Sequence, residues 1–163
     1  MTVNVNGVNF AIYPEKGIAK VFSTRESLIK EAIIPAQFSH NGRTYRVTEI
    51  ESFAFDRSQY LRTVSIPNTV TKIGSAFHDC SNLSSIIIPE SVVELEIGGF
   101  TRTNIRSIVI PKNVAKIGFF NFFECNSLIS IKVDKGNPVY DSRENCNCII
   151  KTDTNALIKG CNN

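Results

Sequence analysis

Apolar and polar residues alternate over short segments of this chain, and the same segment recurs several times. In "LRTVSIPNTVTKIG", Val64 and Ile66 would lie on one side of an extended strand, and Thr63 and Ser65 on the other. The segments "LSSIIIPESVVELEIG" and "IRSIVIPKNVAKIG" follow the same order. This alternation predicts strands that are buried on one side. Each strand would end at its Ile-Pro pair, because proline has no N–H to donate.

The repeated segments have a regular spacing. The prolines at 67, 89 and 111 are 22 residues apart, an earlier Ile-Pro pair ends at Pro35, and a fifth unit reads "LISIKVD". One such strand cannot bury its apolar side alone, so equivalent strands should stack in parallel. Two columns of inward side chains are expected. One contains Val64, Ile86, Ile108 and Ile131, and the other contains Ile66, Ile88, Ile110 and Val133.

The period and the alternation together predict a mainly β fold. We expect a right-handed leucine-rich-repeat solenoid, with a short parallel sheet on one face and turns or short helical turns on the other. The second half of each unit is rich in phenylalanine, which predicts an aromatic column beside the strands. The aromatic column contains Phe55, Phe77 and Phe122, and three residues further along lie Ser58, Cys80 and Cys125.

Both ends of the array should be covered by β-hairpins. Asn6-Gly7 and Asn41-Gly42 are two-residue turn signals, "YPEKGI" marks another turn, and "NCNCIIKTDTNALIKGC" is typical of a hairpin around residues 152–155. We therefore expect one leucine-rich-repeat domain over 1–163. Its parts would be an N-terminal hairpin cap with the first rung (1–47), the repeats (47–133) and a C-terminal hairpin cap (134–163).

Composition narrows the functional classes. The chain has 163 residues, 42% of them hydrophobic, and a net charge of +3 that is too small and scattered to indicate nucleic-acid binding. No apolar run approaches the length that spans a bilayer, so no membrane insertion by this segment is expected. The start of the chain shows no signal-peptide order.

Two stretches carry a family resemblance. "LRTVSIPNTVTKIGSAFHDCSNL" and "IRSIVIPKNVAKIGFFNFFECNSL" resemble the BspA-like leucine-rich repeats, a bacterial surface-protein subfamily also found in some protozoa. The resemblance implies a cell-surface or secreted location and protein ligands, host surface or matrix proteins among them. It also implies no catalytic residue and no cofactor.

The third unit, "LEIGGFTRTNI", departs from the family pattern. Gly99 stands at the usual phenylalanine column, Glu96 stands where glycine is usual, and Thr103 stands at the cysteine position. A further departure is Cys148, where a small apolar residue is commoner. We expect a local irregularity in the third coil and no change of fold.

The cysteines and histidines suggest little chemistry. Cys80 and Cys125 are interpreted as buried small hydrophobes, while Cys146 and Cys161 could pair across the terminal hairpin as a disulfide. "CNC" lacks the spacing of a zinc site, and His78 lies in a coil turn with no nucleophile motif near it. No catalytic, cofactor-binding or metal-binding residue is predicted.

The outward side of the stacked strands is the expected site. Ile87 and Val109 could be ordinary exposed strand residues. Alternatively, they form a small apolar strip, flanked by hydroxyls, that gives a flat face for binding proteins as other solenoids do. The main hypothesis is a non-catalytic protein-interaction module, and the alternative is a spacer with no ligand of its own. The predicted partner-binding face consists of Thr63, Ser65, Ser85, Ile87, Ser107, Val109, Ser130 and Lys132.

Overall fold

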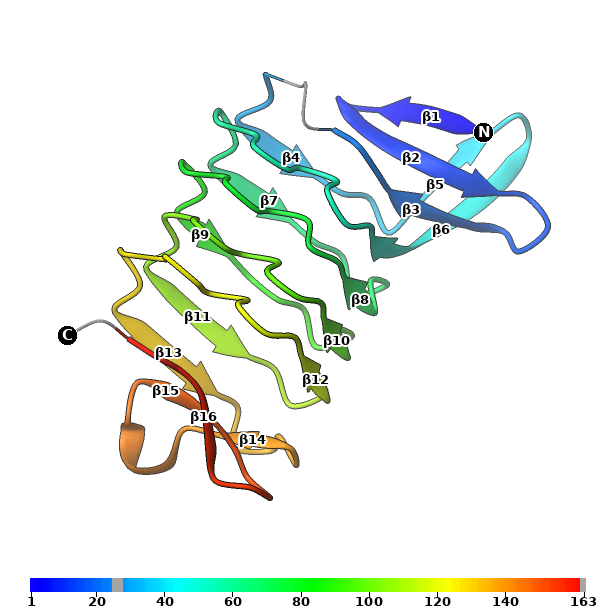
Figure 1. The fold of residues 1–163 in the computed structure, drawn as a ribbon. Coiled ribbons are helices and arrows are strands. Elements are labelled where there is room, and N and C mark those ends of the chain that lie inside the picture. Colours follow the sequence, from blue (N-terminus) through cyan, green and yellow to red (C-terminus); the bar gives the residue numbers. More distant parts are fainter. Residues whose placement is uncertain (25–27, 162–163) are drawn as a thin grey trace.

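The computed structural model describes residues 1–24 and 28–161 of the chain. Its short strands belong to stacked coils, with an N-terminal group of strands at one end and a C-terminal cap at the other (Figure 1). The one helix among the described residues is a 3-10 turn, Arg143–Asn145. The predicted mainly β solenoid is therefore confirmed. No helix in this part of the chain has the length and apolar character needed to cross a membrane.

The N-terminal end is an antiparallel arrangement joined by tight turns. Asn6 and Gly7 have φ of 51° and 83°, and Asn41 and Gly42 have φ of 50° and 73°. Left-handed backbone at both central residues is the geometry that two-residue hairpins need, so both predicted turns are confirmed. The strands are β1 (Thr2–Val5), β2 (Val8–Tyr13), β3 (Ile18–Val21) and β5 (Gln37–His40), which pairs with β6 (Arg43–Ile50).

The first row of strands carries the predicted face. Val64 pairs in register with Ile86, and Ile108 pairs with Ile131. All four side chains are buried in one core. The first inward column is thus confirmed within each sheet, and of the second column Ile110 pairs with Val133. The row consists of β4 (Glu31–Ile33), β7 (Thr63–Ser65), β9 (Ser85–Ile86), β11 (Ser107–Ile110) and β13 (Ser130–Val133).

The first row is paired in two pieces. β4, β7 and β9 form one sheet and β11 and β13 another, so the single sheet that the sequence predicted is interrupted between β9 and β11. The third coil has one residue fewer than its neighbours between its turn and the strand that follows, β11. Two positions separate Thr103 from Ile105, whereas three separate Cys80 from Leu83. This shortening lies where the strand pairing is lost. The irregularity expected in the third coil is therefore the break between β9 and β11.

A second row of parallel strands lies where the sequence predicted only turns. Ile50, Ile73, Leu95 and Ile117 follow one another in register along it. Through β3 and β6 it continues into the N-terminal strands as an eight-stranded sheet. Each coil thus contributes strand pairing on two sides. The row consists of β6 (Arg43–Ile50), β8 (Lys72–Ile73), β10 (Glu94–Leu95) and β12 (Lys116–Ile117).

Four phenyl rings stack through the core beside the strands. The ring centroids of Phe55 and Phe77 are 5.3 Å apart, those of Phe77 and Phe100 5.6 Å, and those of Phe100 and Phe122 5.5 Å. The expectation that Gly99 occupies the phenylalanine column is therefore wrong. The third coil has one residue more before its ring than the second coil, so Phe100 takes the position.

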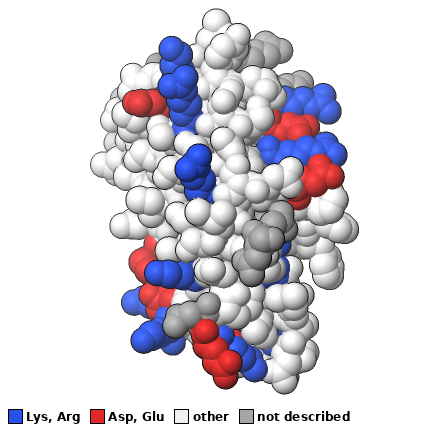
Figure 2. Space-filling view, turned by 90° about the vertical axis from the view of Figure 1, so that its left-hand side faces the viewer, with Lys and Arg blue, Asp and Glu red and all other residues white. Residues whose placement is uncertain are grey.

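The side of the solenoid from which the first-row strands start is seen in Figure 2. Most of its surface is uncharged, and the Lys, Arg, Asp and Glu side chains lie in small separate groups. The described residues in this view therefore form no extended patch of a single charge. The charged groups that matter most for the fold lie on the second row and in the coil turns.

Candidate functional site

The outward residues of the first row form two neighbouring columns. Thr63 is in register with Ser85, and Ser107 with Ser130, while Val109 is in register with Lys132. Ser130 is half-buried and the other five are exposed. The alternation of each strand produces this arrangement, because its opposite side carries the buried column.

Three exposed apolar side chains recur along one outward column of this face, in which Ser65 is in register with Ile33. The side chains of Ile33, Ile87 and Val109 are 63%, 79% and 54% exposed. A shallow depression of about 430 Å³ opens over β4, β7 and β9. The predicted residues that line it are Thr63, Ser65, Ser85 and Ile87, joined by Glu31 and Ile33.

The structure brings together only part of the predicted face. Ser107, Val109, Ser130 and Lys132 do not line this depression, because they belong to the separate pair β11–β13. The face is therefore a hydroxyl-rimmed apolar hollow followed by a second patch. Ile33 and Glu31 complete the hollow. They hold the equivalent strand positions in the first unit, "EAIIP", which the predicted site left out.

The second row carries a column of alternating charges. Lys20 Nζ lies 2.8 Å from Glu49 Oε2, Lys72 Nζ lies 3.7 Å from Glu94 Oε2, and Lys116 Nζ lies 2.5 Å from Glu94 Oε1. These residues also face one another in the strand register. Direct cross-strand pairs of opposite charge favour this register over its neighbours. The residue before each Ile-Gly-like pair alternates in sign along the sequence, a signal that sequence reasoning missed.

Glu96 lies at the corner between the second row and the coil turns. Its carboxylate lies 2.5 Å from Lys72 Nζ and accepts a hydrogen bond from the Ser52 hydroxyl at 2.8 Å. The hydrogen bond to Lys72 lowers the pKa of Glu96, and the same bond raises the pKa of Lys72. The unexpected Glu96 of the third unit is thus an ion-pair partner.

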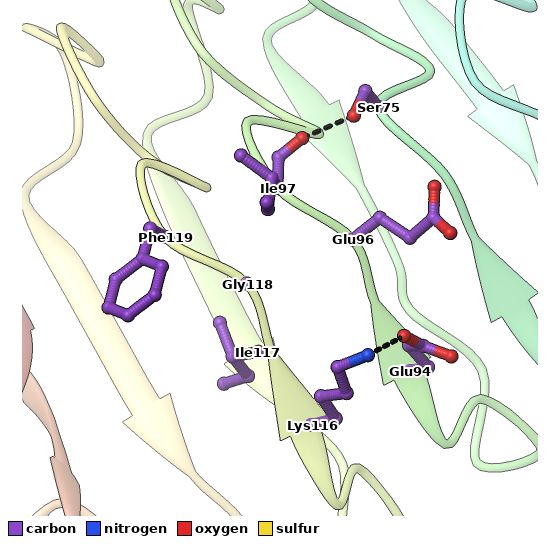
Figure 3. A pocket seen from close by; sticks show the side chains of 8 residues that line it. All are labelled: Ser75, Glu94, Glu96, Ile97, Lys116, Ile117, Gly118 and Phe119. Atoms are coloured by element: carbon purple, nitrogen blue, oxygen red, sulfur yellow. Dashed lines mark hydrogen bonds and ion pairs between the residues drawn. The ribbon is translucent and has the colours of Figure 1, made fainter.

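A second depression, of about 400 Å³, lies at the same corner (Figure 3). Figure 3 shows Lys116 reaching Glu94 on one side, while the Ser75 hydroxyl donates to the Ile97 carbonyl on the other. Because its carboxylates are already paired with lysines, the hollow offers little uncompensated charge to a ligand. Its apolar wall consists of Ile97, Ile117 and Phe119.

His78 has a structural environment. Its Nδ1 lies 2.9 Å from Asp56 Oδ1 in the preceding coil turn and 3.5 Å from Asp79 Oδ2 in its own turn. Within residues 1–24 and 28–161, no group of three or more His, Cys, Asp or Glu side chains could hold a metal ion. We therefore assign His78 to the packing of the coil turns.

Cys80 and Cys125 fill the repeat column as interpreted from the sequence. The Cys80 thiol donates to the Phe55 carbonyl at 3.0 Å, and the Cys125 thiol donates to the Phe100 carbonyl at 3.0 Å. Thr103, which stands in the same column, donates to the Phe100 carbonyl at 2.9 Å. Burial raises the pKa of the Cys80 thiol to about 12, so it is protonated at neutral pH.

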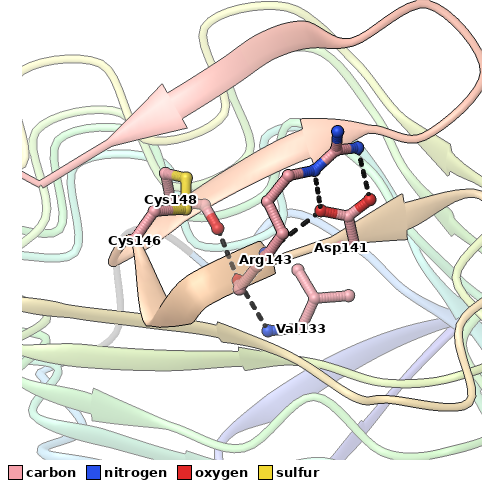
Figure 4. Close-up of a disulfide and its surroundings, with 6 residues drawn as sticks. Val133, Asp141, Arg143, Cys146 and Cys148 are labelled. Carbon is pink, nitrogen blue, oxygen red and sulfur yellow. Dashed lines mark hydrogen bonds and ion pairs between the residues drawn. A yellow bond between two sulfur atoms is a disulfide. The ribbon is translucent and has the colours of Figure 1, made fainter.

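The terminal hairpin contains a disulfide that the sequence did not predict. Cys146 is bonded to Cys148, with Cα atoms 5.2 Å apart, and Cys161 is a free thiol (Figure 4). The hypothesis that Cys146 pairs with Cys161 is therefore wrong. The strands of the cap are β14 (Tyr140–Asp141), β15 (Cys148–Lys151) and β16 (Ala156–Gly160).

A bulge explains the changed cysteine pairing. Lys151 faces Ala156 and Ile150 faces Leu157, as expected, but the register then shifts and Cys148 faces Gly160. One extra residue on β16 moves every later partner by one position. Nearby, the Arg143 guanidinium bonds Asp141 and lowers the pKa of that carboxyl to about 2.

Stacked parallel coils with apolar columns and a phenyl stack define a leucine-rich-repeat solenoid. The sequence model of the BspA type leucine-rich repeat region matches residues 45–154, in 6 copies. The chain belongs to this family.

Solved structures agree with this assignment. A leucine-rich repeat protein from Bacteroides capillosus is similar, with 28% identity and a TM-score of 0.69 over 82% of this chain and 98% of that one. The T. pallidum leucine-rich repeat protein has 20% identity and a TM-score of 0.61, over 81% of this chain and 71% of that one. The pneumococcal vaccine antigen PcpA has 16% identity and a TM-score of 0.60, over 99% of this chain and 56% of that one. The last two support the fold alone. A comparison with curated proteins gave no match.

Proposed function

We propose that this chain is a non-catalytic protein-interaction module that binds protein ligands on the outward face of the first row. The observation that carries the proposal is the exposure of the apolar side chains of Ile33, Ile87 and Val109 beside rows of hydroxyls. Ile87 is the most exposed of the three, at 79%. Fully covering such a side chain would contribute about 1.5–3 kcal/mol.

The composition of the face suits a polypeptide ligand. Serine and threonine hydroxyls both donate and accept, so Thr63, Ser65 and Ser85 can satisfy the backbone groups of a ligand in more than one register. The scaffold beneath is rigid, since the opposite side of each strand is packed in the core. A preformed surface lowers the entropy lost on binding. Lys132 gives the β11–β13 patch a cationic end, which favours an acidic side chain of the ligand there.

Family membership supports a cell-surface or secreted location. On that basis we expect host surface or matrix proteins among the ligands. Binding rather than catalysis is supported by the chemistry of the face, whose described side chains are hydroxyls, aliphatics, one carboxylate and one lysine. These groups lack a paired nucleophile and base.

The test compares two matched double variants in binding to immobilised host surface and matrix proteins. Ile87→Asp with Val109→Asp should weaken binding by roughly 100-fold, from the loss of about 3 kcal/mol of apolar contact. Leu157→Asp with Ile158→Asp is the control, because both residues lie in the C-terminal hairpin and are 66% and 37% exposed. Unchanged binding of the first variant would refute the site. A wild-type chain that bound none of these proteins would favour the spacer.

A further inference from the structure

The turn of the last coil has an unpaired backbone edge. In the inner coils these turns donate N–H groups to the carbonyls of the next coil, from Asp79 to Thr101 at 3.0 Å and from Arg102 to Phe123 at 2.9 Å. The matching N–H groups of the fourth coil are those of Phe120, Phe122 and Glu124. Within the described part of the chain, none of the three donates a hydrogen bond.

The C-terminal cap replaces a fifth coil beside this edge without covering it. The Tyr140 hydroxyl accepts a hydrogen bond from the Ile117 N–H at 2.9 Å. The Asn137 side chain donates to the carbonyls of Pro111 and Val114. These contacts satisfy the last coil at its second-row corner and stop before the turn.

The turn also presents exposed aromatic rings. Phe119, Phe120 and Phe123 are 79%, 68% and 48% exposed, and the rings of Phe120 and Phe123 meet edge to face at 5.7 Å. Three unpaired donors beside three exposed rings resemble an uncovered sheet edge, which is a template for another extended segment.

Charge indicates what that segment should carry. Arg57, Asp79, Arg102 and Glu124 occupy equivalent turn positions, have φ between 54° and 57°, and alternate in sign. Arg102 Nη1 lies 3.7 Å from Asp79 Oδ1, and Arg102 Nε bonds Glu124. The column thus ends on an acidic side chain with a neighbour on one side only. A basic residue would continue it.

We propose that this edge binds an extended segment of a partner protein, which adds one further turn to the array. The segment would offer three carbonyls at every second residue, as Phe119, Asn121 and Phe123 do for the third coil. An arginine or lysine directly after the last of these carbonyls would face Glu124. A second folded copy of this chain is a poorer occupant, because the Ala54 carbonyl in its first coil turn, the equivalent of the Gly99 and Asn121 carbonyls, already accepts a hydrogen bond from the Thr24 N–H.

The probe is a synthetic peptide that copies residues 95–106, in which Arg102 normally lies beside Asp79. Its matched control carries Arg102→Glu. NMR of the labelled protein should show shifts and slowed hydrogen exchange at the amides of Phe120, Phe122 and Glu124. The peptide should bind at least 10-fold more tightly than its control. Glu124→Gln in the protein should remove most of that difference, and Glu124→Arg should reverse it. Arginine tolerates this backbone, since Arg57 and Arg102 adopt it.

Each other outcome overturns the proposal. Shifts confined to the first row would place the peptide on the other face. Equal binding of the two peptides would remove the role of Glu124. Concentration-dependent shifts at the three amides without peptide would make a second copy the occupant. If the free peptide gives no shift, a second experiment fuses the peptide to the protein through a flexible Gly/Ser linker after Asn163. The linker raises the effective concentration of the peptide to about the millimolar range. Unshifted amides in that fusion would also refute the proposal.

Discussion

The Tyr140 hydroxyl accepts a hydrogen bond from the Ile117 N–H at 2.9 Å, at the point where a fifth coil would supply a carbonyl. The Tyr140 side chain is buried, at 5% exposure. One side chain of the cap thus takes the place of a backbone group of the repeat, which joins the last coil to the terminal hairpin.

Replacing this hydroxyl should therefore weaken the end of the array. Tyr140→Phe leaves the Ile117 N–H without its acceptor, and we expect a loss of about 1 kcal/mol in the free energy of unfolding. Urea denaturation measures it. Tyr60→Phe is the control, because Tyr60 is 55% exposed and should change stability by less than about 0.5 kcal/mol. Equal effects of the two changes would contradict a structural role for the bond.

Removing a ring from the middle of the phenyl stack should have a larger effect. Phe77 contacts rings on both sides and is fully buried. Phe77→Ala should cost about 3–5 kcal/mol, through lost contacts and the cavity left behind. Phe119→Ala, at a ring that is 79% exposed, should be nearly neutral. Thermal unfolding followed by circular dichroism compares them, and a single transition in the wild type would also show that the array unfolds as one unit.

Gly74 lies where two coils approach closely. A Cβ added there would come within 2.5 Å of the Ser52 backbone nitrogen, and backbone cannot move aside easily. Gly74→Ala should lower the free energy of unfolding by about 1–3 kcal/mol. At Gly160 a Cβ would meet nothing within 4 Å, so Gly160→Ala should change little. A tolerated Gly74→Ala would mean that the coils can move apart at this point.

The Glu96–Lys72 pair should make stability depend on pH. Because Lys72 lowers the pKa of folded Glu96, the carboxylate stabilises the fold fully above its ordinary pKa of 4.5, and this contribution is lost as the pH falls through the folded value. Glu96→Gln should therefore reduce stability at pH 7 and flatten its decrease below about pH 4.5. Urea unfolding between pH 7 and pH 3 measures both. Glu15→Gln is the matched control.

The cysteine arrangement can be read by alkylation and mass spectrometry. Without reductant, the Cys146–Cys148 disulfide should be intact and Cys161 should react slowly, because burial raises its pKa. Cys80 and Cys125 are buried and should react only after unfolding. A peptide linking Cys161 to either cysteine of the pair would contradict the structure.

The parts of the fold that repeat could be predicted from the sequence. The pairing of Val64 with Ile86 could be predicted, because each lies at the same distance from an Ile-Pro pair. The turns at Asn6-Gly7 and Asn41-Gly42 could also be predicted, since few other residues suit left-handed backbone at both positions. The outward face followed from the same alternation.

What could not be predicted depends on differences of one residue. The second coil has one residue fewer before its ring than the third, and the third coil has one fewer between its ring and Ile105, so the proline spacing of 22 hid both the position of Phe100 and the break between β9 and β11. A bulge on β16 likewise decided the partner of Cys146. The second row could not be predicted, because most of its repeat strands are only two residues long. Such strands are too short to show an alternation of apolar and polar residues.

The spacing of the phenyl rings has a consequence for the shape of longer arrays. Ring centroids follow one another at 5.3–5.6 Å, whereas paired strands lie about 4.7–4.9 Å apart. The ring side of each coil is thus about half an ångström thicker than its strand side. Because the two sides differ in thickness, successive coils are tilted toward the strand side, and each added coil would lengthen the concave arc around a ligand on the strands.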